Sequence, residues 1–291
     1  MSSGDKTVSK ALPNPQAPIP AWGTYRLSAW GAMWMRFSQS RSLGWWGRRL
    51  ALWGRKLALL GAGEWIDGEA EGIRIRAGRR GNVSDRKFLF MPQFVDARER
   101  EFLRHCLTRG GTFVDIGANA GVYSLGMAQT YRGLGGGRVL AVEPNPGIAP
   151  RLHSNIGLND LGGIVEVVDR ALSDSEGSVT FTISSDNLGQ SGMARAERGT
   201  QVTVATTTLL KLLTDRHVTS VDGLKIDIEG AEDQVLMPFL ACAPDALLPR
   251  CIVIEDSRST WKQDLMAAFT RRGYTIALEA RMNLVLKRTM A

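Results

Sequence analysis

The sequence predicts an α/β fold: a doubly wound, mainly parallel sheet of seven strands, preceded by a basic helical extension at the N-terminus. From residue 112 onward, apolar β-type runs alternate with helix-type segments, a pattern typical of parallel strands joined by crossover helices. The first of these strands runs into a glycine-rich turn and a helix. Before them lies a segment of different composition, rich in Trp and Arg.

These patterns divide the chain into three parts. Residues 1–21 are polar and then proline-rich, so we expect a disordered tail. Residues 22–95 are expected to form a Trp/Arg-rich helical extension followed by short cap strands. Residues 96–291 are expected to form the cofactor-binding sheet domain.

The extension carries seven of the eight tryptophans, within residues 22–65. One apolar stripe recurs there at helical spacing and is made of Leu43, Trp46, Leu50, Trp53, Leu57 and Leu60. A basic helix with tryptophan on its apolar face is typical of a membrane interface. The alternative is that the stripe packs on the sheet domain or on a second subunit. No apolar run reaches the roughly 20 residues that a spanning helix needs.

Two short strands are expected next, IRIRA at 73–77 and KFLFM at 87–91, with a turn at Gly81-Asn82. We expect this pair to cap an edge of the main sheet or to cover the cofactor.

The sheet domain is expected to follow in regular order. Its strands are predicted at 112–115, 138–142, 164–169, 223–228, 251–255, 274–278 and 283–286. Its helices are predicted at 99–108, 122–131, 147–157, 207–215, 231–240 and 260–271. A hairpin at 178–183 and 201–205 flanks a polar loop, 186–193, for which two roles stay open: closing over the acceptor, or a flexible surface loop.

The glycine turn follows the first core strand, which ends in Asp115, and holds glycine at 117 and 121. Glycine lets the backbone approach a ligand closely, and the free N–H groups of the helix start then face that ligand. The next strand ends in Glu143, where a carboxylate suits the two hydroxyls of a ribose. The sequence therefore predicts a nucleoside site; a strand–turn–helix junction without a ligand is the alternative.

The glycine spacing indicates which nucleoside binds. A dinucleotide site needs G-x-G-x-x-G, so that the pyrophosphate meets the helix start, but this chain has D-x-G-x-x-x-G. Asp115 would repel a pyrophosphate and suits the ammonium and sulfonium groups of S-adenosylmethionine. The pattern thus favours S-adenosylmethionine over NAD.

Several motifs in fixed order resemble a known family. GGTFVDIGANAGVYS, AVEPNP, LHSNIGLN, RALSDSEG and LKIDIEGAE resemble the FkbM-type S-adenosylmethionine-dependent methyltransferases, over roughly residues 100–257. The resemblance implies a class I methyltransferase fold with a Rossmann-like sheet. It also implies O-methylation of a hydroxyl on a sugar, glycolipid or secondary metabolite.

Ligands of open α/β sheets bind beyond the carboxyl ends of the strands, so residues there are the site candidates. The expected cofactor-binding residues are Asp115, Gly117, Asn119, Gly121, Glu143, Asp169, Ala171 and Asp227. The expected catalytic residues are Asp227 and Glu255. For Asp169 the alternative is a turn residue, and for Asp227 it is neutralisation of Lys225 on the same strand face.

The charge is unevenly placed along the chain. Residues 1–95 hold 15 of the 36 Lys and Arg and 6 of the 29 Asp and Glu, a net charge of +9. The remainder has a net charge of −2. Because nucleic-acid enzymes usually present a basic surface around the site, this map disfavours a nucleic-acid acceptor. A small-molecule, glycan or lipid-linked acceptor is expected instead.

The three cysteines are far apart in sequence and form no C-x-x-C. Their odd number and spacing predict neither a disulfide framework nor a zinc site and fit a reducing compartment. No metal site is predicted, although Asp227, Glu229, Glu255 and Asp256 carry the oxygens that Mg²⁺ prefers. No apolar signal segment follows the start, so we expect a cytoplasmic protein, with the inner face of the membrane as its binding surface if the extension docks there.

Two further functions stay open at this point. One is a membrane-associated nucleoside-binding protein without catalysis. The other is an NAD-type oxidoreductase, which the missing third glycine and Asp115 disfavour.

Overall fold

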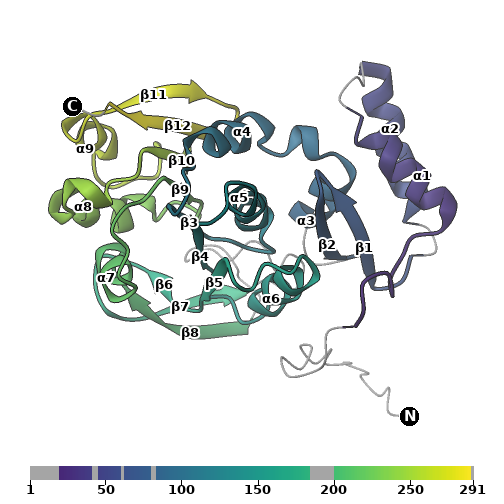
Figure 1. Cartoon of the computed structure of the whole chain (residues 1–291), viewed down its shortest axis with the longest axis horizontal. Coiled ribbons are helices and arrows are strands. Elements are labelled where there is room, and N and C mark those ends of the chain that lie inside the picture. The colour runs from purple at the N-terminus through teal and green to yellow at the C-terminus, as the bar shows by residue number, and fades with distance from the viewer. Residues whose placement is uncertain (1–19, 41–44, 60–61, 80–82, 184–199, 290–291) are drawn as a thin grey trace, which may run out of the picture.

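The computed structural model of the chain describes residues 20–40, 45–59, 62–79, 83–183 and 200–289. Figure 1 shows a sheet flanked by helices, with the N-terminal elements gathered on one side. Almost all of the predicted tail 1–21 lies outside the described residues, as do the turn at Gly81-Asn82 and the loop 186–193.

The main sheet has seven strands in the order β11-β12-β10-β9-β3-β4-β5. They are β3 (Thr112–Ile116), β4 (Arg138–Val142), β5 (Val165–Val168), β9 (Gly223–Ile226), β10 (Cys251–Glu255), β11 (Tyr274–Glu279) and β12 (Asn283–Arg288). Strands β5, β4, β3, β9 and β10 are parallel, and β12 is antiparallel to both of its neighbours. The predicted mainly parallel sheet with a closing antiparallel pair is therefore confirmed.

Helices cover both faces of this sheet (Figure 1). One apolar core contains side chains of α4 (Ala97–Cys106), α5 (Val122–Gly133) and α6 (Ala149–Leu158). The second contains side chains of α7 (Leu209–Asp215), α8 (Glu232–Cys242) and α9 (Leu265–Arg271). Within β3, Phe113 joins the first core and Val114 the second, as the two-residue period of a strand requires. The fold is thus doubly wound.

The strand order reverses at β3, which pairs with β4 on one side and with β9 on the other. Connections that leave adjacent strands toward opposite faces open a crevice between them. This places the crevice of the sheet at the ends of β3 and β9.

The predicted hairpin forms a sheet of its own. Strands β7 (Gly177–Ile183) and β8 (Thr200–Thr207) pair antiparallel, and β6 (Ala171–Leu172) adds to β8 in parallel. Val179 and Phe181 of β7 reach the cavity described below.

The N-terminal extension contains helices α1 (Ala29–Ser38) and α2 (Trp45–Ala58), strands β1 (Trp65–Ala70) and β2 (Ile73–Gly78), and helix α3 (Val83–Phe90). The prediction of a strand at IRIRA is confirmed, but its partner is β1, because KFLFM lies in α3 and the following turn. The strand prediction for KFLFM is wrong. Phe88, Leu89 and Phe90 are all buried, and a continuous apolar run does not distinguish a buried helix from a buried strand.

The β1–β2 hairpin packs on a helix and does not extend the main sheet. The backbone N–H groups of Arg74 and Arg76 donate to the amide oxygens of Asn159 and Asn155 on α6, at 2.9 and 2.8 Å. The Asn159 amide nitrogen donates back to the carbonyl of Arg74 at 2.7 Å. The outer edge of β2 is therefore paired by side chains of α6.

The predicted apolar stripe of α2 faces solvent. Its described members Trp46 and Trp53 are 76% and 67% exposed, and Leu50 and Leu57 are also exposed. The adjoining face of α2 is buried through Ala51, Gly54 and Ala58. A Cβ at Gly54 would collide with the Trp34 ring of α1, so a small residue lets the two helices approach. The stripe thus does not pack on the described part of the sheet domain.

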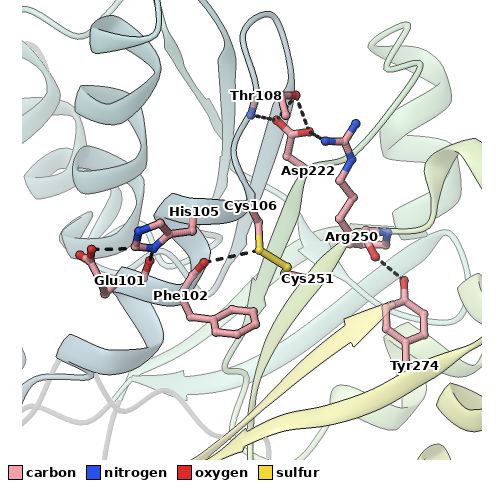
Figure 2. Close-up of a disulfide and its surroundings, with 10 residues drawn as sticks. Glu101, Phe102, His105, Cys106, Thr108, Asp222, Arg250, Cys251 and Tyr274 are labelled. Atoms are coloured by element: carbon pink, nitrogen blue, oxygen red, sulfur yellow. Dashed lines mark hydrogen bonds and ion pairs between the residues drawn. A yellow bond between two sulfur atoms is a disulfide. The ribbon is translucent and has the colours of Figure 1, made fainter. Parts of the chain in front are cut away.

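A disulfide joins Cys106, at the end of α4, to Cys251, at the start of β10 (Figure 2). The prediction that the cysteines form no disulfide is wrong. The two residues are 145 positions apart in sequence, but α4 packs directly over β10, with a Cα–Cα distance of 6.5 Å. Beside the disulfide, the buried Asp222 accepts hydrogen bonds from the Thr108 amide and from the Tyr131 hydroxyl, at 2.8 and 3.0 Å. Cys242 is the remaining, exposed thiol.

Candidate functional site

A cavity of about 560 Å³ opens at the carboxyl ends of β3, β4, β9 and β10. Six of the predicted site residues line it: Gly117, Asn119, Glu143, Ala171, Asp227 and Glu255. Asp115, Gly121 and Asp169 do not. Residues predicted from the strand ends therefore lie together around one cavity.

The glycine loop has backbone conformations that explain its composition. Gly117 has a φ of +74°, and a Cβ there would collide with the carbonyl oxygen of Asp227. Its N–H donates to the carbonyl of Val142 at 3.0 Å, which ties the loop to β4. Gly121 precedes α5 as its N-cap, has a φ of +97°, and does not line the cavity.

Asp115 lies beneath the loop and is completely buried. Its Oδ2 accepts a hydrogen bond from the Ser124 hydroxyl at 2.5 Å, and its Oδ1 lies 3.8 Å from the Lys225 ammonium. Burial raises the pKa of Asp115, against the opposing effects of Lys225 and Ser124. The structure thus places this carboxylate under the cavity floor, where it fixes its neighbours.

Lys225 connects the two strands that border the crevice. It donates to the carbonyl of Gly117 at 2.8 Å, and its ammonium lies 3.5 Å from the Asp227 carboxylate. Burial disfavours its charged form, but the carboxylates of Asp227 and Asp115 raise its pKa. The pairing explains why charged residues occur in the buried stretch LKIDIE: Lys225 is a buried cation, and Asp115 and Asp227 supply the carboxylates that neutralise it.

Glu143 is held at the end of β4 by two backbone donors. Its Oε2 accepts from the Asn119 N–H at 2.8 Å, and its Oε1 accepts from the Asn145 N–H at 2.9 Å. Burial raises the pKa of Glu143 to about 7 despite these hydrogen bonds. Because each oxygen has a second lone pair, the carboxylate can still accept from ligand hydroxyls.

Of the two residues predicted after the third core strand, Ala171 lines the cavity and Asp169 does not. Asp169 is exposed and does not line the cavity, whereas Ala171, Leu172 and Ser173 do. The strand ends at Val168, so Asp169 falls in the turn that follows. The exposed position of Asp169 after the strand agrees with the alternative given for it, a turn residue.

Glu255 and Asp227 face the cavity from adjacent strand ends. Partial burial and the neighbouring charges of Asp227, Glu229 and Glu232 raise the pKa of Glu255 to about 7. A carboxyl group with this pKa is poised for proton transfer near neutral pH. In the described part of the chain, no group of three or more His, Cys, Asp or Glu is arranged to hold a metal ion.

The N-terminal extension forms one wall of the cavity, which the sequence did not predict. Ser84, Asp85 and Lys87 of α3, with Val95 and Asp96 before α4, line the cavity. The lining also includes residues from other elements that were not predicted as site residues, among them Lys225, Tyr123, Phe181, Gln234 and Met282. The apolar run of α3 predicts a strand, because a short continuous apolar run does not show a helical period.

These features fit S-adenosylmethionine, the cofactor expected from the sequence. The cavity volume lies within the range of cofactor sites. Glu143, after β4, supplies acceptors for hydroxyls, and the carboxylate of Asp227, after β9, suits an ammonium group.

The sequence also matches known proteins. Residues 115–276 match the methyltransferase FkbM domain family. A curated relative, the methyltransferase sdnD of Sordaria araneosa, is 29% identical over 170 residues, 46% of this chain and 64% of that protein. The chain therefore spans slightly less than two thirds of this relative's length.

Solved structures share low sequence identity with the chain. An S-adenosylmethionine-dependent methyltransferase from Agrobacterium tumefaciens is 12% identical with a TM-score of 0.46, covering 78% of this chain and 71% of that one. TYW2 of M. jannaschii, solved in complex with AdoMet, is 12% identical with a TM-score of 0.40, covering 79% and 89%. At these values the fold assignment depends on the strand order described above.

Proposed function

Because this chain belongs to the FkbM methyltransferase family and uses S-adenosylmethionine, we propose that it methylates a hydroxyl group of a sugar, a glycolipid or a secondary metabolite. One observation carries the proposal: Glu143 and Glu255 line the same cavity. Glu143, at the end of one strand, suits the hydroxyls of a ribose, and Glu255, at the end of another, has a pKa of about 7 and suits a general base. Family membership favours methyl transfer over the oxidoreductase and over a binding protein without catalysis.

We assign the cofactor to the floor of the cavity. Gly117, Asn119 and the backbone of the loop would border it, Glu143 would bind its ribose, and Ala171 would border its base. When bound, the cofactor supplies a methyl group activated by a positively charged sulfur. Asp227, fixed by Lys225, would hold its ammonium group.

The acceptor then requires a proton acceptor and a fixed orientation. Glu255 takes the proton of the attacking hydroxyl, since a carboxylate whose pKa is near 7 is both available and basic at neutral pH. Much of the remaining rate enhancement comes from positioning the two reactants. The near-neutral charge of residues 96–291 supports an acceptor other than nucleic acid.

Incubation with methyl-labelled S-adenosylmethionine and a cell-envelope extract tests this function. The label is expected in a methyl ether of a hydroxyl-bearing glycan, lipid or metabolite, identified by mass analysis. The variant Glu255→Gln serves as control and should bind S-adenosylhomocysteine without transferring label. Label on nitrogen, or in a nucleic-acid fraction, would contradict the proposed acceptor.

We further propose that the α1–α2 pair binds the surface of an anionic membrane. Its exposed apolar side chains are Trp30, Met33 and Phe37 on α1 and Trp46, Leu50, Leu52, Trp53 and Leu57 on α2. No acidic residue lies between residues 29 and 58, whereas Arg36, Arg49 and Lys56 are exposed. Tryptophan at headgroup depth beside cations matches an anionic lipid interface. No described helix is long and apolar enough to cross a bilayer.

Vesicle flotation compares the wild type with the triple variant Trp46→Ser, Leu50→Ser, Trp53→Ser. Binding to vesicles with anionic lipid should fall by about 10-fold or more, since three apolar side chains that would be buried in the lipid interface are lost. Ile276→Ser, an equally apolar exposed site on β11, is the matched control. Unchanged flotation together with a dimer that becomes a monomer would identify the stripe as a subunit interface.

For its place in the cell we propose the cytoplasm, at the inner face of the membrane. The cytoplasmic leaflet carries the anionic lipid that suits the exposed cations of α1 and α2, which supports this placement. The number and spacing of the cysteines do not support it, because Cys106 and Cys251 are bonded. Fractionation of cells that express the protein tests this placement.

A further inference from the structure

Asp85, in the first turn of α3, has a buried carboxylate to which no other described residue donates a hydrogen bond. Its side chain is 1% exposed and lines the cavity. Neither carboxylate oxygen accepts a hydrogen bond from another described residue, although the backbone N–H of Asp85 itself lies close enough to lower the pKa of the carboxyl group. Buried polar groups are nearly always paired, so an unpaired carboxylate facing a cavity points to a partner that enters the cavity.

The charged neighbours of Asp85 do not satisfy it. Arg86 on the same helix and Arg151 on α6 lie close enough to favour its ionised form, but Asp85 forms an ion pair with neither. Nη1 of Arg151 is itself buried without a hydrogen-bond partner. The guanidinium of Arg151 instead stacks over the Trp65 ring, 5.1 Å from its centroid. The carboxylate is therefore desolvated, with its lone pairs available.

A purely structural role is the alternative, because carboxylates in the first turn of a helix favour the helix dipole. Asp233 on α8 shows what that role looks like in this chain. It is equally buried in a first turn, but it accepts hydrogen bonds from the Lys262 and Gln263 amides at 2.8 and 3.1 Å, and it lies outside the cavity lining. Asp85 has no such partners.

We propose that Asp85 is a ligand-binding residue that accepts a hydrogen bond from a hydroxyl or amino group of a molecule bound in this cavity. Two sources carry this chemistry, the nucleoside part of the cofactor and the acceptor. The proposal rests on the assignment of the cavity to the cofactor and acceptor made above. It gives the extension a direct part in ligand recognition.

The stability of the ligand-free protein separates the two roles of Asp85. Burial raises the pKa of Asp85 to about 7, against the opposing charges of Arg151 and Arg86. A carboxyl group whose pKa is higher in the folded state loses its stabilising contribution as the pH rises through that value. At pH 8, Asp85→Asn should therefore raise the melting temperature of the ligand-free protein, whereas Asp233→Asn should lower it because its hydrogen bonds are weakened.

Binding of S-adenosylhomocysteine, measured by titration calorimetry, tests the nucleoside source. Asp85→Asn should weaken it by about 10-fold or more, the effect of a hydrogen bond to a charged group, and Asp233→Asn should leave it unchanged. Unchanged affinity with a lower rate of transfer to the envelope extract at saturating S-adenosylmethionine would assign Asp85 to the acceptor. A destabilised Asp85→Asn protein with unchanged affinity and rate would overturn the proposal. Glu143→Ala in the same titration checks the cavity assignment separately from Asp85.

Discussion

The sheet domain and the N-terminal extension place their apolar side chains in opposite ways. In the domain, both faces of the sheet are covered, and Leu125 and Phe269 are almost fully buried in its two cores. On α1 and α2, by contrast, lie eight of the eleven large apolar side chains that the described residues expose. The domain sequence is explained by its own packing. The exposed apolar side chains of the α1–α2 pair are not explained by packing within the described residues, and the proposed membrane contact would account for them.

The extension also differs in how it meets the domain. Its β1–β2 hairpin is held to α6 by hydrogen bonds, and α3 packs on this hairpin and forms a wall of the cavity. Helix α2, by contrast, contacts mainly α1. Figure 1 shows α1 and α2 at the outer side of this arrangement. In the extension, α3 therefore contributes to the cavity, whereas α1 and α2 expose the apolar side chains proposed to contact a membrane surface.

The largest effect is expected in the domain, at Glu255. Glu255→Gln removes the proposed base and should lower kcat by about 10²–10⁴-fold. Wild-type activity should rise as the pH passes about 7, where this carboxyl ionises, and the variant should lose that rise. Rates measured from pH 5 to 9 check both. Asp256→Asn, which changes the adjacent residue bonded to Arg258, is the control; an equal loss there would remove the special role of Glu255.

Stability should depend strongly on the disulfide of the domain. The double variant Cys106→Ser, Cys251→Ser should lower the free energy of unfolding by about 2–5 kcal/mol, because the bond closes a long loop. Urea unfolding measures this, with Cys242→Ser, the exposed thiol, as control. A double variant as stable as the wild type would show that the bond contributes nothing.

Cofactor affinity should fall when Glu143 is removed. Glu143→Ala deletes an acceptor for ribose hydroxyls, and binding of S-adenosylhomocysteine should weaken by about 10- to 100-fold. Calorimetry measures the affinity, and Glu166→Ala on β5, outside the cavity, is the control. If both variants bind equally, the ribose lies elsewhere.

The smallest effect concerns the link between the two regions. Asn155 accepts from the Arg76 N–H of β2 and donates to the carbonyl of Ala120 in the glycine loop at 2.9 Å. Asn155→Ala leaves both groups unpaired and should lower stability by about 1–2 kcal/mol. Thermal unfolding measures this, with the exposed His153→Ala on the same helix as control. No loss would mean that extension and domain are held together by other contacts.

The sequence predicts the sheet and the floor of the site well, for one physical reason. In a parallel sheet, strand periodicity and strand direction together place residues such as Glu143 and Glu255 at one edge. The wall formed by α3 was missed because its apolar run lacks a helical period. The disulfide was missed because distance along the chain does not report distance in space.

The role of individual charges was also only partly predictable. The alternation around Lys225 indicated buried charge that must be paired, and the structure adds its partners Asp115 and Asp227. The buried position of Asp115 beneath the loop could not be predicted, because a strand-end pattern does not distinguish the last buried residue from the first one facing the ligand.

The double hydrogen bonding of Asn155 limits how this protein can be shortened. A truncation that begins at residue 96 would expose the flank of α6, leave the amide oxygens of Asn155 and Asn159 without the donors of β2, and remove Asp85 from the cavity. The minimal unit for biochemical work therefore starts upstream of β1, even though the family match begins at residue 115.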